Sequence, residues 1–151
     1  IIVIWVGLLL VVFVYKKWYS EALFLGSNLV LTALLVLLLK NIYQRPRPSI
    51  LHLVEEKGFS FPSGHSLAST LVLGSLIIII SQHVKNKTAR YCLQGLLVLG
   101  IVTIVVSRVY VGVHYPSDVL GSMILGLAVL QFEYPLYDRL RFQWRFTGKQ
   151  K

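Results

Sequence analysis

The run ALFLGSNLVLTALLVLLL at 22–39 constrains the fold of this chain more than any other feature, because it holds 18 residues without a charge. A helix of about 20 mostly apolar residues crosses the hydrocarbon core of a bilayer. Hydrophobic residues make up 56% of the 151 residues and charged residues only 14%, against about 25% in soluble domains. We therefore predict an all-α, polytopic transmembrane helix bundle with five spans, at about 1–17, 21–39, 66–82, 89–107 and 119–136.

The first apolar stretch, IIVIWVGLLLVVFVY, opens the chain with neither an initiator Met nor a polar leader. We interpret residues 1–151 as a single integral-membrane domain that is truncated at its N-terminus. The one cysteine, Cys92, excludes a disulfide within the chain.

Basic residues lie in the gaps between the apolar blocks, and their distribution predicts the topology. One set of gaps carries ten of them, namely Lys16, Lys17, Lys85, Lys87, Arg90, Arg139, Arg141, Arg145, Lys149 and Lys151. The other set carries five, namely Lys40, Arg45, Arg47, Lys57 and Arg108. This bias places the first set in the cytoplasm and the second on the extracytoplasmic face of the cell membrane. We interpret the basic tail as an anchor beside anionic lipid rather than a nucleic-acid site, so the expected partner is the bilayer.

Three polar segments interrupt the apolar pattern on the second side: KNIYQRPRP at 40–48, FPSGHS at 61–66 and SRVYVGVHYPSD at 107–118. No comparable set of acids neutralises their cations Lys40, Arg47 and Arg108, since only Glu55, Glu56 and Asp118 lie in these gaps. Such charges beside a membrane are costly unless they are paired. Arginine presents a fork of donors that matches phosphate, and lysine adds a point charge. The three segments therefore predict one shallow site for an anionic ligand.

The remaining polar residues of these segments suggest phosphoryl transfer. Ser63 and Gly64 precede a span, where backbone N–H groups favour an anion and glycine allows close approach. His114 is followed four residues later by Asp118, which could hold one imidazole nitrogen as N–H and leave the other free to attack. His65 could then protonate the leaving group.

Each of these residues also has a structural interpretation when it is taken alone. An arginine at a span end is often a snorkelling anchor, and YPSD could be only a helix start capped by Ser117 or Asp118. In the loop 49–60, Glu55 and Glu56 could tune head-group choice or be solvated charges, and His52 receives no role. Zinc bound by the two histidines and Asp118 is disfavoured, because three cations nearby would repel it.

Together the segments resemble the type 2 phosphatidic acid phosphatase superfamily, the metal-independent lipid phosphatases that share their site with vanadium haloperoxidases. The family has three motifs, K-x6-R-P, P-S-G-H and S-R-x5-H-x3-D, and all three occur here in order. They stand as Lys40, Arg47 and Pro48, then Pro62 to His65, then Ser107, Arg108, His114 and Asp118. The flanking spans fit the family's six-helix core with its first part missing, so we expect six spans in the full protein.

The resemblance implies a ping-pong mechanism without a metal or other cofactor. His114 would attack phosphorus and form a phosphohistidine, Asp118 would orient it, and His65 would protonate the leaving group. Lys40, Arg47, Ser63, Gly64 and Arg108 would hold the phosphoryl oxygens. The residues in and around the motifs are most similar to those of bacterial members of the family. This resemblance favours conversion of phosphatidylglycerophosphate to phosphatidylglycerol.

Alternatives to this substrate and this class stay open at the level of sequence. Undecaprenyl pyrophosphate, or phosphatidic acid and diacylglycerol pyrophosphate together, would suit the same motifs. A catalytically silent lipid-binding protein is disfavoured because both His65 and His114 are present. A transporter would predict charged or broken helices near the bilayer midplane, and the haloperoxidases are largely soluble.

Overall fold

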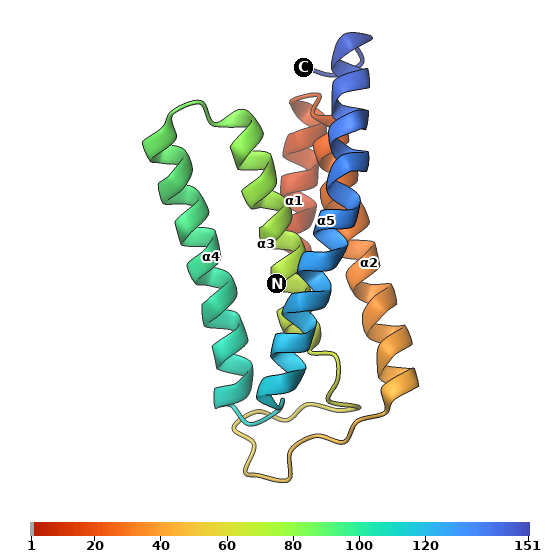
Figure 1. The fold of residues 1–151 in the computed structure, drawn as a ribbon, viewed down its shortest axis with the longest axis vertical. Coiled ribbons are helices and arrows are strands. Elements are labelled where there is room, and N and C mark those ends of the chain that lie inside the picture. The colour runs from red at the N-terminus through yellow and green to blue at the C-terminus, as the bar shows by residue number, and fades with distance from the viewer. Residues whose placement is uncertain (1) are drawn as a thin grey trace.

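Five helices make up the fold, and the computed structural model describes residues 2–151 (Figure 1). They are α1 (Ile2–Tyr15), α2 (Tyr19–Tyr43), α3 (Gly64–His83), α4 (Lys87–Tyr110) and α5 (Pro116–Phe146). No strand occurs within residues 2–151. The prediction of an all-α bundle is confirmed, and each predicted span coincides with one helix.

Four of the helices, α2 to α5, are long and apolar enough to cross a membrane. α1 is apolar but has 14 residues, which is shorter than a full span. α5 continues to Phe146, ten residues beyond the predicted end at 136, and passes through Pro135. Proline removes one backbone donor, yet membrane helices tolerate it where neighbouring groups compensate. Apolar content alone therefore underestimated the length of this helix.

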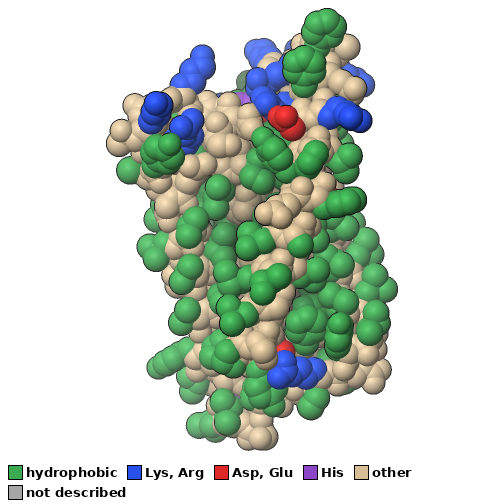
Figure 2. Space-filling model, in the orientation of Figure 1, with side chains coloured by type: hydrophobic (Ala, Val, Ile, Leu, Met, Phe, Trp, Pro, Cys, Tyr) green, Lys and Arg blue, Asp and Glu red, His purple; other side chains and the backbone are tan. Residues whose placement is uncertain are grey.

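α3 lies at the centre of the bundle, with α2, α4 and α5 packed against it. Leu67 and Leu71 of α3 are fully buried, as is Leu25 of α2. Most large apolar side chains elsewhere point outward, and Figure 2 shows them spread over the middle of the molecule. An apolar exterior is what a bilayer requires, because lipid tails are as apolar as leucine.

The bundle has two chemically different ends. The end that carries the C-terminus and the α1–α2 and α3–α4 turns, which we call the tail end, gathers many of the lysines and arginines (Figures 1 and 2). The opposite end, which we call the loop end, carries the long α2–α3 connection 44–63 and the α4–α5 turn (Figure 1). The three polar segments picked out in the sequence therefore lie together at the loop end.

A buried acid joins the helices at the tail end. Glu21 of α2 is fully buried, and its Oε1 lies 2.9 Å from His83 Nε2 at the end of α3. Tyr137 of α5 donates to the same oxygen at 3.1 Å, and Gln150 donates to Oε2 at 3.3 Å. A buried charge is tolerated only when it is paired and hydrogen-bonded, so this cluster closes the tail end.

We expect Gly126→Ala to weaken the contact between α3 and α5. A Cβ at this position would lie 2.7 Å from Thr70 Cγ2 and 2.9 Å from Thr70 Cβ. Thr70 cannot easily move away, because it is stiff at χ1 and its hydroxyl donates to the Ser66 carbonyl at 2.8 Å. Overpacking of this kind costs about 1–3 kcal/mol. The thermal midpoint of the purified protein in detergent should fall.

Gly95→Ala in α4 is the matched control, because a Cβ there meets nothing within 4 Å. Alanine is also the better helix former, so this variant should leave the midpoint unchanged or raise it slightly. Equal midpoints for the two variants would contradict the close approach of α3 and α5.

Candidate active site

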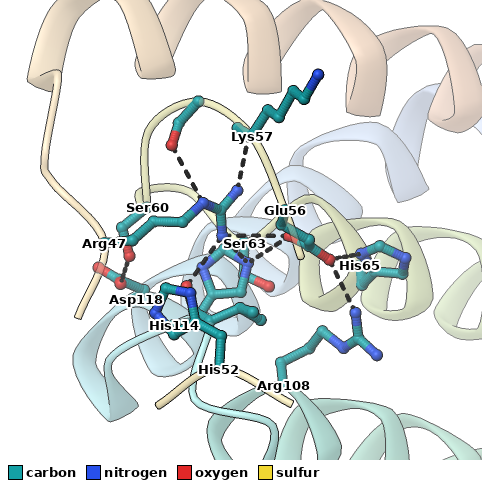
Figure 3. Close-up of polar contacts among 12 residues, drawn as sticks. Arg47, His52, Glu56, Lys57, Ser60, Ser63, His65, Arg108, His114 and Asp118 are labelled. Atoms are coloured by element: carbon teal, nitrogen blue, oxygen red, sulfur yellow. Dashed lines mark hydrogen bonds and ion pairs between the residues drawn. The ribbon is translucent and has the colours of Figure 1, made fainter. Parts of the chain in front are cut away.

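The residues predicted to form the site do lie at one end of the bundle, where three separate parts of the chain converge (Figure 3). The last turn of α2 and the connection after it supply Lys40 and Arg47, the start of α3 supplies His65, and the end of α4 supplies Arg108. A pocket of about 640 Å³ opens between these segments. Its lining includes Gly64 and the polar or charged residues Thr32, Lys40, Arg47, Glu56, Lys57, His65 and His114.

The α2–α3 connection follows from local sequence signals. α2 ends where Gln44 adopts a left-handed conformation and donates its N–H to the Lys40 carbonyl at 3.0 Å. The prolines of RPRP then prevent the helix from continuing. The chain crosses the loop end and starts α3 with Ser63 as N-cap.

Ser63 supports the α3 start from within the protein. Its hydroxyl accepts from the Ser66 N–H and donates to the Ser66 hydroxyl, and its own N–H donates to Ser122 Oγ at 2.9 Å. The expected contact between Ser63 and a phosphoryl oxygen would therefore compete with these bonds. Gly64 and His65 occupy the first turn, where backbone N–H groups have no acceptor within the helix, and Gly64 also lines the pocket.

Arg47 ties the loop to the α4–α5 turn. Its Nε donates to the Gly58 carbonyl and its Nη2 to the Lys57 carbonyl, both at 3.1 Å. Nη1 donates to the Val113 carbonyl at 2.9 Å. These three bonds hold the guanidinium in one orientation, with Nη1 also facing the pocket.

The carboxylate of Glu56 lies between Arg47 and Arg108 (Figure 3). The sequence did not predict this position. Its carboxylate lies 3.2 Å from Arg47 Nη1 and 3.0 Å from Arg108 Nη1. The same carboxylate lies 3.7 Å from His114 Nε2 and 3.9 Å from His65 Nδ1. In sequence, Glu56 looks like its neighbour Glu55, which is exposed, and only the path of the loop distinguishes the two acids.

His114 is buried, with 1% of its side chain exposed, and its Nε2 faces the pocket. Nε2 lies 3.5 Å from Arg47 Nη1, and Nδ1 has no hydrogen-bond partner among residues 2–151. Burial lowers the pKa of His114 below its ordinary value, and the Arg47 cation lowers it further. Glu56, the Ser60 backbone and Asp118 act on this pKa in the opposite direction. The result favours a neutral imidazole, which has a nitrogen lone pair available for attack.

Asp118 is placed differently from the expectation that it holds the imidazole of His114. Its fully buried carboxylate accepts from the Tyr115 N–H at 2.9 Å, from the Ser60 hydroxyl, and from Arg45 Nη1 at 2.6 Å. The bond to Tyr115 makes Asp118 part of the α5 start, with Tyr115 as the N-cap residue. The carboxylate therefore acts on His114 through its charge, while its hydrogen bonds organise the backbone beside the imidazole.

Arg45 is the clearest site residue that sequence reasoning missed. It binds Asp118 and donates to Ser117 Oγ at 2.9 Å, and its guanidinium lies 4.3 Å from the centre of the Tyr115 ring. RPRP contains two arginines two residues apart, and nothing in the local pattern separates their roles. Arg47 faces the pocket and Arg45 holds Asp118.

Comparison with known proteins identifies the family. The model of the PAP2 superfamily matches residues 21–142, which is most of the chain. The chain belongs to the PAP2 superfamily. The resemblance inferred from the three motifs is thereby confirmed.

The relatives include several membrane lipid phosphatases. Phosphatidylglycerophosphatase B of Bacillus subtilis is 37% identical over 76% of this chain and 57% of its own length. Lipid A 4'-phosphatase of Porphyromonas gingivalis is 28% identical over 86% of this chain and 58% of its own length. Undecaprenyl-diphosphatase BcrC of Bacillus subtilis is 30% identical over 93% of this chain and 71% of its own length. The chain thus spans less than two thirds of the length of the first two relatives.

A solved structure agrees with the fold. The crystal structure of a transmembrane PAP2-type phosphatidylglycerolphosphate phosphatase from Bacillus subtilis is similar with a TM-score of 0.75 at 28% identity. The match covers 88% of this chain and 70% of the other. The helix bundle is therefore one that the superfamily uses for a membrane-integral protein.

We expect His114 to titrate below the ordinary histidine value of about 6.5, because burial and Arg47 both disfavour its charged form. NMR of protein labelled at its histidine rings, in detergent, would follow the titration. The signal would be assigned by its absence in His114→Gln. A midpoint at or above the ordinary value would contradict the neutral imidazole.

Proposed function

We propose that this protein is a lipid phosphatase that hydrolyses a phosphate group from a membrane lipid through a phosphohistidine on His114. The observation that carries the proposal is the composition of the pocket at the loop end that is lined by His65 and His114. One part of its lining is cationic and carries both histidines, and the other part is apolar. Such a pocket fits an amphipathic molecule with a phosphate at one end.

The apolar part of the pocket runs along α2. Leu29, Ala33, Val36 and Leu37 line it together with Lys40, at the spacing of one helix face. Lys40 marks the polar boundary in the last turn of α2. A lipid tail could therefore lie along α2 in the bilayer while the head group reaches the arginines.

The chemistry follows from the groups around the pocket. His114 Nε2 would attack phosphorus, forming a P–N bond while the bond from phosphorus to the lipid oxygen breaks. His65, with 52% of its side chain exposed at the pocket edge, would give its proton to the departing oxygen. Water would then attack the phosphorus of the phosphohistidine, forming a P–O bond while the P–N bond to His114 breaks. His65 would accept a proton from that water as free phosphate forms.

Charge stabilisation would come from Arg47, Arg108 and Lys40, together with the Gly64 N–H. Arg47 is held by backbone carbonyls before the substrate arrives, and preorganised donors stabilise the charge that develops on the phosphoryl oxygens. Asp118 would contribute a nearby negative charge that favours the positive charge growing on His114. We assign Ser63 a supporting role, because its hydroxyl caps α3. No step requires a metal ion.

We favour phosphatidylglycerophosphate as the substrate, and the 37% identity to phosphatidylglycerophosphatase B supports it. Undecaprenyl pyrophosphate is the second candidate, because BcrC matches a larger share of both chains. Phosphatidic acid and diacylglycerol pyrophosphate are further alternatives. The distribution of basic residues supports a catalytic end on the extracytoplasmic face.

We expect purified protein in detergent to release phosphate from phosphatidylglycerophosphate, and EDTA to leave the rate unchanged. His114→Ala should lose at least about a thousandfold in kcat, as removal of a nucleophile does. His52→Gln is the matched control, because His52 lies in the same loop end but contacts the Pro48 carbonyl instead of the pocket. It should retain the activity.

Parallel assays with phosphatidic acid and undecaprenyl pyrophosphate would rank the substrates. Acid quenching during turnover should trap radioactive phosphate on wild type but not on His114→Ala. Phosphate release that persists in His114→Ala would overturn the role of this histidine. Absence of release from all three lipids would overturn the proposed function.

A further inference from the structure

We propose that Glu56 is an internal occupant of the phosphate site, which the phosphate of a substrate or product must displace. This inference rests on the proposed function, because it takes the cationic pocket as the phosphate site. It assigns a role to a residue outside the three family motifs.

The carboxylate of Glu56 makes the contacts that a phosphate would make. One oxygen lies 3.2 Å from Arg47 Nη1 and the other 3.0 Å from Arg108 Nη1, so the group bridges the two arginines. The two imidazoles flank it at 3.7 and 3.9 Å. A phosphoryl group that His114 can attack must lie next to His114 Nε2, which is where one of these oxygens lies (Figure 3).

The hydrogen bonds of Arg47 leave little room for both anions. Its Nε and Nη2 each donate to a loop carbonyl, and Nη1 donates to the Val113 carbonyl. Nη1 also reaches into the pocket, where it contacts the carboxylate of Glu56. A phosphate that uses Arg47 must take over this contact, and two anions in van der Waals contact would repel each other.

Glu56 can leave by rotation of its side chain while the loop stays in place. The backbone before it is tied by the Leu53 N–H, which donates to the Val111 carbonyl at 3.0 Å. The backbone after it is tied by Arg47 at Lys57 and Gly58, and by the Ser60 N–H at 2.7 Å from the Arg45 carbonyl. The Glu56 side chain lies at the edge of the pocket with 20% of its surface exposed, so rotation would carry the carboxylate into water.

Internal occupancy has a measurable consequence. A site that is mostly filled by its own carboxylate binds an external anion more weakly. The apparent dissociation constant equals the intrinsic one divided by the fraction of molecules in which the site is open. If Glu56 fills the site in about nine molecules of ten, its removal should tighten phosphate binding about tenfold. Removal of a genuine binding residue would instead weaken binding.

The test compares Glu56→Gln with Glu55→Gln. Both substitutions remove one negative charge from the same loop, but Glu55 is exposed and makes no ion pair among residues 2–151. Binding of inorganic phosphate to each purified protein in detergent would be measured by calorimetry, with no lipid substrate present. We expect Glu56→Gln to bind about 3- to 10-fold more tightly than wild type, and Glu55→Gln to bind like wild type.

Turnover supplies a second measurement. If Glu56 only competes with the substrate, Glu56→Gln should lower KM with kcat little changed. A fall in kcat with unchanged phosphate affinity would make Glu56 a participant in the chemistry and overturn the proposal. Equal tightening in both variants would also overturn it, because the effect would then be one of general charge.

Glu56→Ala covers the possibility that glutamine keeps the contacts of the carboxylate, and it should also bind phosphate more tightly. If neither Glu56 variant gives a monodisperse protein, Glu56 is a structural tie and the proposal fails. The calorimetry separates this inference from the proposed function. Tighter phosphate binding by a protein that hydrolyses none of the lipids would support Glu56 as occupant and refute the lipid phosphatase.

Discussion

The loop end depends on the hydrogen bonds and the ion pair that the buried carboxylate of Asp118 makes. This carboxylate joins the α2–α3 connection, through Ser60 and Arg45, to the α5 start, through the Tyr115 N–H. The same turn of α5 reaches α3, because Ser122 donates to the Asp118 carbonyl and accepts from the Ser63 N–H. Removing one partner from such a buried charge typically costs about 3–5 kcal/mol. The position of His114, four residues before Asp118, follows from this arrangement.

The helices could be predicted from the sequence because each is an apolar block bounded by polar or helix-breaking residues. RPRP after α2 and the serine before α3 act locally, so their effect is visible in one short segment. The end of α5 was missed because residues 137–146 are mixed in character, and the Tyr137 contact with Glu21 of α2 stabilises them. That contact joins residues far apart in sequence and has no local signature.

The site residues divide in the same way. Lys40, His65, Arg108 and His114 are predictable because each lies at or near a helix end, and the topology brings those ends together. Arg47 lies in the connection after α2 and is predictable from its place in the K-x6-R-P motif. Arg45, Ser60 and Glu56 lie in or beside the long connection 44–63, which has no periodicity. Their positions depend on where the loop crosses the loop end, and the backbone bonds from Arg47 fix that path. Sequence reasoning therefore found the groups that we propose act on a phosphate and missed Arg45, Ser60 and Glu56, which contact them.

The two buried or partly buried glutamates show how the environment separates a structural charge from a displaceable one. Glu21 is fully buried, and its carboxylate oxygens lie 2.9 to 3.3 Å from hydrogen-bonding atoms of four residues, namely Ser20, His83, Tyr137 and Gln150. Glu56 has two close cations, but its imidazole neighbours lie beyond hydrogen-bond distance and water reaches its side chain. Converging arginines repel each other unless an anion lies between them, so the empty site needs a carboxylate. Partial exposure of that carboxylate leaves it free to exchange with a phosphate.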